Sequence, residues 1–213
     1  VICVGCRLYI NNTGYEYEKF AREAKVIVVD IDAVEHQKQT AKIDKFVLSD
    51  ARAFFEQMQG MSRLLIDAWR EKCAHWKKAF PTCEETRKHG ERIDMYWFMQ
   101  ALSDALPNNA TIVSDAGNSY YITTSGVHVN PSKRQRSITS AAQAEMGYTL
   151  PATIGASFAT YELVVGVSGD GSVMMNIQDM ATLAFHNRNI KLFIMNNNGY
   201  SSIRQLQNSS FRG

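Results

Sequence analysis

The chain has 213 residues, 45% of them hydrophobic and 10% aromatic, which is enough for one or two globular domains with a sizeable core. Its formal net charge at pH 7 is only +2, so charge gives no reason to expect nucleic acid or a membrane surface as a partner. No apolar run approaches the roughly 20 residues of a membrane-spanning helix. The chain has only four cysteines, and its first residues show neither a basic n-region nor a cleavage site, so we expect a cytoplasmic protein without a signal peptide or a disulfide scaffold.

Residues 1–59 alternate between strand and helix patterns, as in part of a Rossmann-like domain. Cys3 and Cys6 form a C-x-x-C along the first apolar run. Because a zinc site needs a second pair and a redox pair needs a helix N-terminus, buried reduced thiols are the better interpretation. The elements expected here are strands over residues 1–5, 25–31 and 45–50, a helix over residues 14–24, and a helix over residues 50–58 capped by Ser49 or Asp50.

Residues 60–92 are polar, helix-forming and mixed in charge, which predicts a helix followed by a linker. A second α/β unit then begins with a helix that Asp94 caps and Pro107 ends. The next expected elements are a strand over residues 111–115 and a helix over residues 146–160. A basic cluster lacks interleaved aromatic residues, so it is interpreted as a solvated loop; its members are Lys133, Arg134 and Arg136.

Polar side chains follow the last two predicted strands, whose apolar runs are typical of buried parallel strands. Asp170 lies in the turn Gly169-Asp170-Gly171-Ser172 after one run, and Asn197 ends the next. In an open α/β sheet, ligands bind outside the carboxyl ends of the strands. Mg²⁺ prefers carboxylate, amide, carbonyl and phosphate oxygens. The two turns therefore predict a site for a hard cation that carries a phosphate group.

This pattern resembles the signature of thiamine-diphosphate (ThDP) enzymes, in which a GDG turn, a helix and a second strand precede an NN turn. The helix is expected within residues 176–187, with Asn176 as its cap. Its expected apolar face consists of Ile177, Met180, Leu183 and Ala184. The plainer alternative is an ordinary α/β protein with a Gly-Asp turn and an Asn-rich turn, but the strand–turn–helix context favours the family.

Further segments support the same resemblance, in the order that the family has. Residues 113–119 (VSDAGNS) resemble its diphosphate-side turn, and residues 144–156 (AEMGYTLPATIGA) resemble its MGyxLPaAiGA segment. Residues 1–14 and 28–38 are similar to parts of its central domain. Together these segments cover nearly all of the chain and look most like the acetolactate-synthase-like branch.

The resemblance implies an α/β fold with parallel sheets in two parts. Residues 1–59 are expected to belong to a Rossmann-like central domain, residues 60–92 to a helix and linker, and residues 93–213 to the ThDP diphosphate-binding domain. Few residues follow the NN turn, whereas the family continues. Both domains are therefore expected to be incomplete parts of a longer polypeptide, and what shortens the chain stays open.

The resemblance also assigns site residues. The side-chain oxygens of Asp170 and Asn197 and the carbonyl of Gly199 are expected to bind Mg²⁺ or Ca²⁺. Met146 is expected to wedge beneath the cofactor, with core packing as the alternative. The full set of expected cofactor contacts is Asn118, Ser119, Ala144, Met146, Gly169, Gly171, Ser172, Asn197 and Tyr200.

By resemblance, the expected reaction is decarboxylation of a pyruvate-like 2-keto acid and transfer of the acyl unit to an acceptor. No catalytic residue is expected in this chain, because the activating Glu of the family comes from another domain of a partner subunit. The protein should therefore be a homo-oligomer with its active site between subunits, and this chain alone should be inactive. Leu206 replaces a Trp that is usual in true acetolactate synthases, which favours another acceptor. Arg7 matches an Arg near FAD in flavin-carrying members, so FAD stays open as a further cofactor.

Three alternatives remain. Within the family, the protein could be a simple 2-keto acid decarboxylase. A Rossmann-type nucleotide-binding protein would need a G-x-G-x-x-G at a helix start, which the sequence lacks. A non-catalytic paralogue would show damage at Asp170 or Asn197, and both residues are intact.

Overall fold

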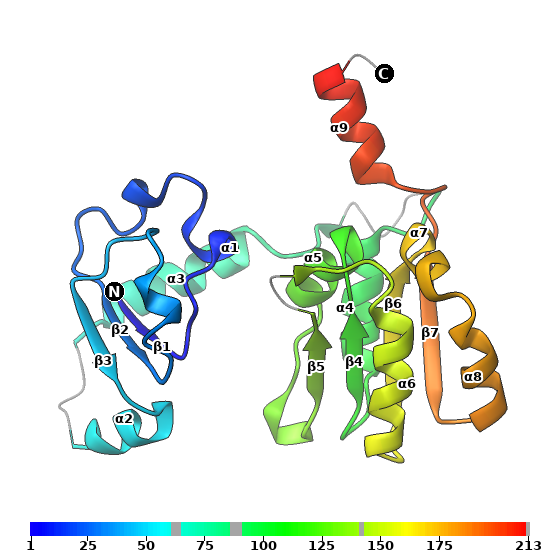
Figure 1. The fold of residues 1–213 in the computed structure, drawn as a ribbon, viewed down its shortest axis with the longest axis horizontal. Coiled ribbons are helices and arrows are strands. Elements are labelled where there is room, and N and C mark those ends of the chain that lie inside the picture. The colour runs from blue at the N-terminus through cyan, green and yellow to red at the C-terminus, as the bar shows by residue number, and fades with distance from the viewer. Residues whose placement is uncertain (61–64, 86–90, 141–142, 212–213) are drawn as a thin grey trace. The chain divides into compact units, whose positions relative to one another are not determined.

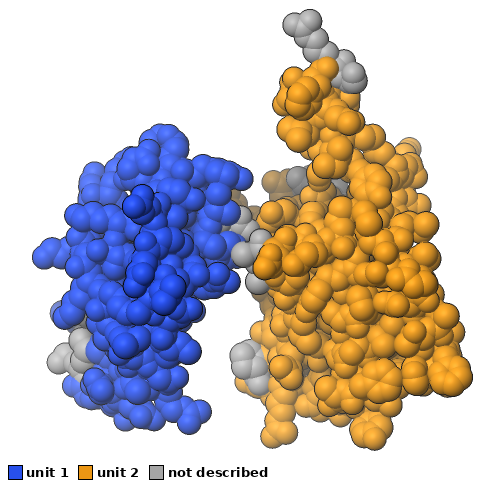
Figure 2. All heavy atoms as spheres, in the orientation of Figure 1, with its two compact units in different colours: residues 1–71 blue, residues 72–213 orange. Residues whose placement is uncertain are grey.

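The structure is a computed structural model that describes residues 1–60, 65–85, 91–140 and 143–211. The chain forms two compact units, residues 1–71 and residues 72–213, and the division falls within helix α3 (Asp67–Ala79) (Figure 2). Each unit has its own parallel sheet (Figure 1). The predicted α/β fold class is confirmed. The three predicted segments of the chain stay a prediction.

The first unit is built on a three-stranded parallel sheet of order β1-β2-β3. Its strands are β1 (Ile2–Val4), β2 (Ile27–Asp30) and β3 (Lys45–Leu48), and the remaining elements are α1 (Ile10–Thr13), η1 (Tyr17–Lys19), η2 (Glu35–Gln37) and α2 (Ala51–Gln57). Leu8, Val26 and Val28 form its buried core. All four cysteines are free thiols, but Cys3 and Cys6 are half-buried rather than buried as the sequence predicted.

Two helix predictions in this unit have opposite outcomes. Asp50 caps α2 as predicted, because its carboxylate accepts hydrogen bonds from the backbone N–H groups of Arg52 (2.8 Å) and Ala53 (3.4 Å). The helix predicted over residues 14–24 is wrong, since this segment holds only the short η1. Ala21 takes a left-handed backbone (φ 47°) and packs against the core, which ends any helix there.

The second unit is built on a four-stranded parallel sheet of order β5-β4-β6-β7. Its strands are β4 (Thr111–Ser114), β5 (Arg136–Thr139), β6 (Val164–Gly169) and β7 (Ile190–Met195). Its helices are α4 (Met95–Ala105), α5 (Gly117–Gly126), η4 (Pro131–Lys133), α6 (Thr149–Ala159), α7 (Asp170–Val173), η6 (Met174–Asn176), α8 (Asp179–His186) and α9 (Ser201–Phe211). Figure 1 shows the strands side by side, with helices packed along them.

Helices cover this sheet on both faces, which buries its central strands. On one face, Met99 of α4 and Ile122 of α5 pack with Ile112 and Val165 of the sheet. On the other face, α6, α7, α8 and β7 contribute to a second cluster; its members are Leu150, Ile154, Val173, Leu183, Ile190 and Leu192. Burial on both faces explains why β6 is part of a nearly continuous apolar run rather than an alternating pattern.

Several predicted elements of this unit are confirmed and two are corrected. Asp94 caps α4 by accepting from the N–H groups of Tyr96 and Trp97. The helix predicted from residue 146 begins only at Thr149, because Gly147 has a left-handed backbone (φ 87°). Arg136 is not in a loop but begins the edge strand β5.

The helix predicted after the GDG turn is also corrected at its start. Asn176 does not cap α8; Gln178 precedes that helix, and the Asn176 side chain donates to the carbonyl of Gly147 instead. Of the predicted apolar face, Leu183 packs in the core, whereas Ile177 and Met180 are 45% and 40% exposed. No helix among the described residues combines the length and apolar character that a bilayer crossing requires.

Candidate functional site

The two predicted metal turns lie at the same edge of the second sheet. Strands β6 and β7 are parallel neighbours, and Gly169 is paired with Met195 at their carboxyl ends. The Asp170 carboxylate joins the turns, since its Oδ1 accepts from the N–H of Gly171 (3.0 Å) and its Oδ2 from the N–H of Gly199 (2.6 Å). The structure therefore brings the GDGS turn and the NN turn together around one carboxylate.

The NN turn has a defined backbone shape. Asn198 and Gly199 both have left-handed backbones (φ 62° and 90°), and Asn196 Oδ1 accepts from the N–H of Asn198 (2.9 Å). The guanidinium of Arg204, in α9, donates to the carbonyls of Asn197 (2.9 Å) and Asn198. Arg204 was not among the predicted site residues, because its position in the sequence does not show that it folds back onto the turn.

The donor groups at this edge suit a hard cation better than a soft one. Among the described residues, no group of three or more His, Cys, Asp and Glu side chains gathers as a metal site. The candidate site instead offers one carboxylate, from Asp170, beside the amide of Asn197 and the carbonyl of Gly199. Oxygen ligands of this kind, few in number and completed by water and phosphate oxygens, fit Mg²⁺. The ligand assignment itself stays a prediction.

Gly171 is required by its neighbour Tyr200. A Cβ added to Gly171 would lie 2.7 Å from Cε1 of the Tyr200 ring. Tyr200, which follows the NN turn, is 48% exposed. The ring of one turn therefore lies against the backbone of the other, which places both predicted cofactor contacts at the same edge.

The remaining predicted diphosphate contacts lie in the first turn of α5, directly after β4. Asn118 is exposed, whereas Ser119 is only 4% exposed. The Ser119 hydroxyl contacts Asp115 Oδ1 (3.0 Å) and the carbonyl of Ala116 (2.6 Å). Its side chain is thus committed to the protein interior, and its role toward a diphosphate stays a prediction.

The segment of residues 143–148, here called the Met146 loop, is anchored to the GDGS turn. Gly147 donates its N–H to Ser172 Oγ (2.7 Å), and its carbonyl accepts from Asn176 Nδ2 (2.9 Å). Ala144 takes a left-handed backbone (φ 49°), which is uncommon for a residue with a side chain. Met146 is 40% exposed, so it is not a fully buried core residue. The Met146 loop and the metal turns thus belong to one connected region.

Asp115 is a residue of this region that sequence reasoning missed. It is fully buried and accepts hydrogen bonds from several segments, including the hydroxyl of Ser172 (2.5 Å). A signal was present, because Asp115 follows the buried strand β4 just as Asp170 follows β6. Its donors, however, come from segments that are far apart in the sequence.

Arg7, the residue behind the FAD alternative, is part of an ion-pair cluster in the first unit. Its guanidinium donates to Glu35 Oε2 (2.9 Å), and Lys38 contacts the other oxygen of the same carboxylate. Hydrogen bonds from these two cations, the larger effect coming from Arg7, lower the pKa of Glu35 to about 2. The structure thus gives Arg7 a protein partner, and a flavin role stays untested.

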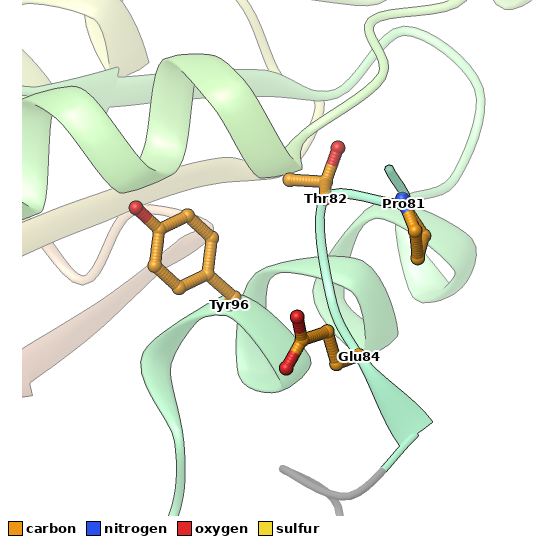
Figure 3. Close-up of a pocket in the computed structure, with 4 residues that line it drawn as sticks. All are labelled: Pro81, Thr82, Glu84 and Tyr96. Atoms are coloured by element: carbon orange, nitrogen blue, oxygen red, sulfur yellow. The ribbon is translucent and has the colours of Figure 1, made fainter. Parts of the chain in front are cut away.

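A separate hollow lies in the second unit. It has a volume of about 310 Å³ and is lined by Pro81, Thr82, Glu84 and Tyr96 (Figure 3). None of these residues belongs to the two turns or to the Met146 loop. The hollow is therefore not part of the candidate site.

The comparisons with known proteins agree with the class that the two joined turns predict, that of the thiamine pyrophosphate enzymes. Residues 115–213 match the family model of the thiamine pyrophosphate enzyme C-terminal TPP binding domain. That range contains the GDGS turn, the NN turn and the Met146 loop. The predicted resemblance is thereby confirmed.

More narrowly, the chain is acetolactate-synthase-like. It is 30% identical over 220 residues to acetolactate synthase 2, chloroplastic, from Nicotiana tabacum, a match that spans 100% of this chain and 32% of that protein. It is 31% identical over 215 residues to the acetolactate synthase isozyme 1 large subunit of Escherichia coli (strain K12), which spans 97% of this chain and 36% of that protein. The chain thus spans about a third of the length of the curated relatives that it matches.

Proposed function

We propose that the protein containing this chain is a ThDP- and Mg²⁺-dependent enzyme that decarboxylates a 2-keto acid such as pyruvate and transfers the acyl unit to an acceptor. The observation that carries the proposal is the Asp170 carboxylate, which bonds the N–H groups of Gly171 and Gly199 at the ends of adjacent parallel strands. This arrangement places a carboxylate between two turns whose other groups are neutral oxygens and backbone amides. Such an arrangement is expected at a site where a cation tethers a diphosphate to the protein.

The residues of this chain would serve to bind and orient. Asp170, Asn197 and Gly199 would hold the cation, and the backbone of the GDGS turn would approach the diphosphate at Gly169, where nothing lies within 4 Å of a would-be Cβ. Met146, from its half-exposed position, would contact the organic part of the cofactor. When bound, ThDP supplies the electron sink for loss of carbon dioxide from the 2-keto acid.

The acceptor is proposed to differ from that of true acetolactate synthases. Leu206 stands where they usually carry a Trp, and its side chain is 54% exposed on α9. A smaller apolar group changes the shape that an acceptor would meet. Substrate comparison with pyruvate as donor and a panel of keto-acid and aldehyde acceptors would test this proposal, and a clear preference for a second pyruvate would contradict it.

The protein is further proposed to act as a homo-oligomer with the activating Glu supplied by a partner subunit. Large apolar side chains stay exposed directly after the GDGS turn; they are Met174 (61%), Met175 (51%), Ile177 (45%) and Met180 (40%). Exposed apolar groups gathered beside a candidate site are typical of an interface. Light scattering after size-exclusion chromatography should give at least a dimer, and an active monomer would refute this proposal.

Calorimetric titration of the full-length protein with ThDP, with and without Mg²⁺, tests the central proposal. Binding should require the metal, and Asp170→Ala should abolish the metal-dependent part. A matched control is Asp179→Ala, which removes a half-buried carboxylate in the first turn of α8, outside the two turns, and should leave binding unchanged. If Asp170→Ala retains Mg²⁺-dependent binding, the site assignment is wrong.

A further inference from the structure

Asp115 is a buried carboxylate to which neither the family signature nor the metal turns assign a role. It follows β4 directly, and its exposed fraction is 0%. Oδ1 accepts from the N–H of Ala116 (2.7 Å) and from Ser119 Oγ (3.0 Å). Both bonds lie within its own segment and hold the start of α5.

The second oxygen collects donors from three other segments. Oδ2 accepts from the N–H of Thr149 (3.3 Å), from Ser168 Oγ (3.1 Å) and from Ser172 Oγ (2.5 Å). These donors belong to the start of α6, the end of β6 and the helix that begins at the GDGS turn. All three donor residues are buried. A buried carboxylate needs such donors, because its burial is costly without hydrogen bonds.

The contact with Ser172 continues toward the Met146 loop. The Ser172 hydroxyl donates to Asp115 and accepts from the N–H of Gly147 (2.7 Å). Because a hydroxyl has one hydrogen, its donation to Asp115 leaves only its lone pairs for Gly147, which fixes the direction of both bonds. A chain of hydrogen bonds therefore runs from Asp115 through Ser172 to Gly147, next to Met146.

We propose that Asp115 is a positioning residue for the cofactor. Through Ser172, Asp115 fixes the position of the GDGS turn relative to the Met146 loop. The distance between the part of the site that binds the diphosphate and the part that binds the organic rings therefore stays constant. This inference rests on the proposed function, because it assigns the two parts to one bound ThDP. Residues that hydrogen-bond to the groups that contact a ligand commonly change its affinity, although they do not touch the ligand themselves.

The test compares Asp115→Asn, Ser172→Ala and the double variant in the full-length protein. Hydrogen exchange of the Gly147 amide without ligand reports the hydrogen-bond chain, and calorimetry with ThDP at saturating Mg²⁺ reports positioning. Each single variant should speed exchange at Gly147 and weaken ThDP binding by about tenfold or more. The double variant should bind ThDP as well as the single variant that has the lower affinity, because both residues act through one chain of hydrogen bonds.

Ser157→Ala is the matched control, since it removes another buried serine hydroxyl of the same unit, which donates only to the carbonyl of Ile154 (2.7 Å). It should leave both measurements unchanged. If Asp115→Asn does not fold, hydrogen exchange at Gly147 in Ser172→Ala without ligand still decides, because this measurement does not depend on a direct contact between Ser172 and the cofactor. Three results would overturn the inference but leave the proposed function standing. They are wild-type ThDP affinity in the single variants, unchanged exchange at Gly147, and a loss of affinity in the double variant that equals the product of the two single losses. A wild-type protein that binds no ThDP would overturn the proposed function and the inference with it.

Discussion

Replacing Gly147 by alanine should destabilise the second unit strongly. The backbone of Gly147 is left-handed (φ 87°), which costs a residue with a side chain about 1–2 kcal/mol. The new Cβ would also lie 2.7 Å from Met175 Cβ and 3.0 Å from Asn176 Nδ2, and overpacking of this kind costs about 1–3 kcal/mol. The two costs together predict a loss of about 2–5 kcal/mol in the free energy of unfolding.

Urea denaturation monitored by circular dichroism measures this loss, and helix α6, which begins two residues after Gly147, provides a control. Gly155 lies in α6 with nothing within 4 Å of its would-be Cβ and without a left-handed backbone. Gly155→Ala should therefore stabilise the unit by up to about 1 kcal/mol, since alanine is the better helix former. The reasoning fails if Gly147→Ala unfolds at the wild-type urea concentration, or if the two variants shift stability in the same direction.

Three further predictions concern single contacts. Asp94→Ala should lower the free energy of unfolding by about 0.5–2 kcal/mol through loss of the α4 cap, and Asp94→Ser should restore most of it in a thermal melt. Arg188→Ala should cost about 1–3 kcal/mol in urea, because its guanidinium bonds the carbonyls at the end of α6; an unchanged midpoint would mean that these bonds contribute nothing. The pKa of Glu35 is lowered to about 2 from an ordinary 4.5, so its ion pairs stabilise the fold above pH 4.5 and stop doing so as the pH falls toward 2. Acid unfolding curves of wild type and Glu35→Gln should thus differ above pH 4.5 and converge near pH 2; a constant gap would contradict the assignment.

Elements whose signals are local could be predicted from the sequence. The carboxylates of Asp50 and Asp94 cap the helices expected after them, because capping involves only the next three residues. Strands β6 and β7 were predicted from their apolar runs, and the placing of Asp170 near the NN turn followed from the geometry of parallel sheets.

Elements that depend on contacts distant in the sequence could not. The segment around Phe20 has a helical pattern, but packing of Phe20 and Ala21 against the core of the first unit overrides it. Strand β5 begins with Arg136 and has no apolar run, because an edge strand stays partly in water. The partners of Asp115 are scattered over four segments, so no local pattern shows that this carboxylate is buried and fully bonded.

The shape of the NN turn depends on helix α9, because Arg204, whose guanidinium binds two carbonyls of the turn, belongs to that helix. Helix α9 has eleven residues and buries none of them, and an isolated helix of that length barely holds together in water. Unwinding it would withdraw the guanidinium from two carbonyls and let the adjacent glycine backbone rotate. Anything that covers Ile203, Leu206 and Phe211, which now face solvent, would therefore stabilise the shape of the NN turn, where we propose that the cation binds.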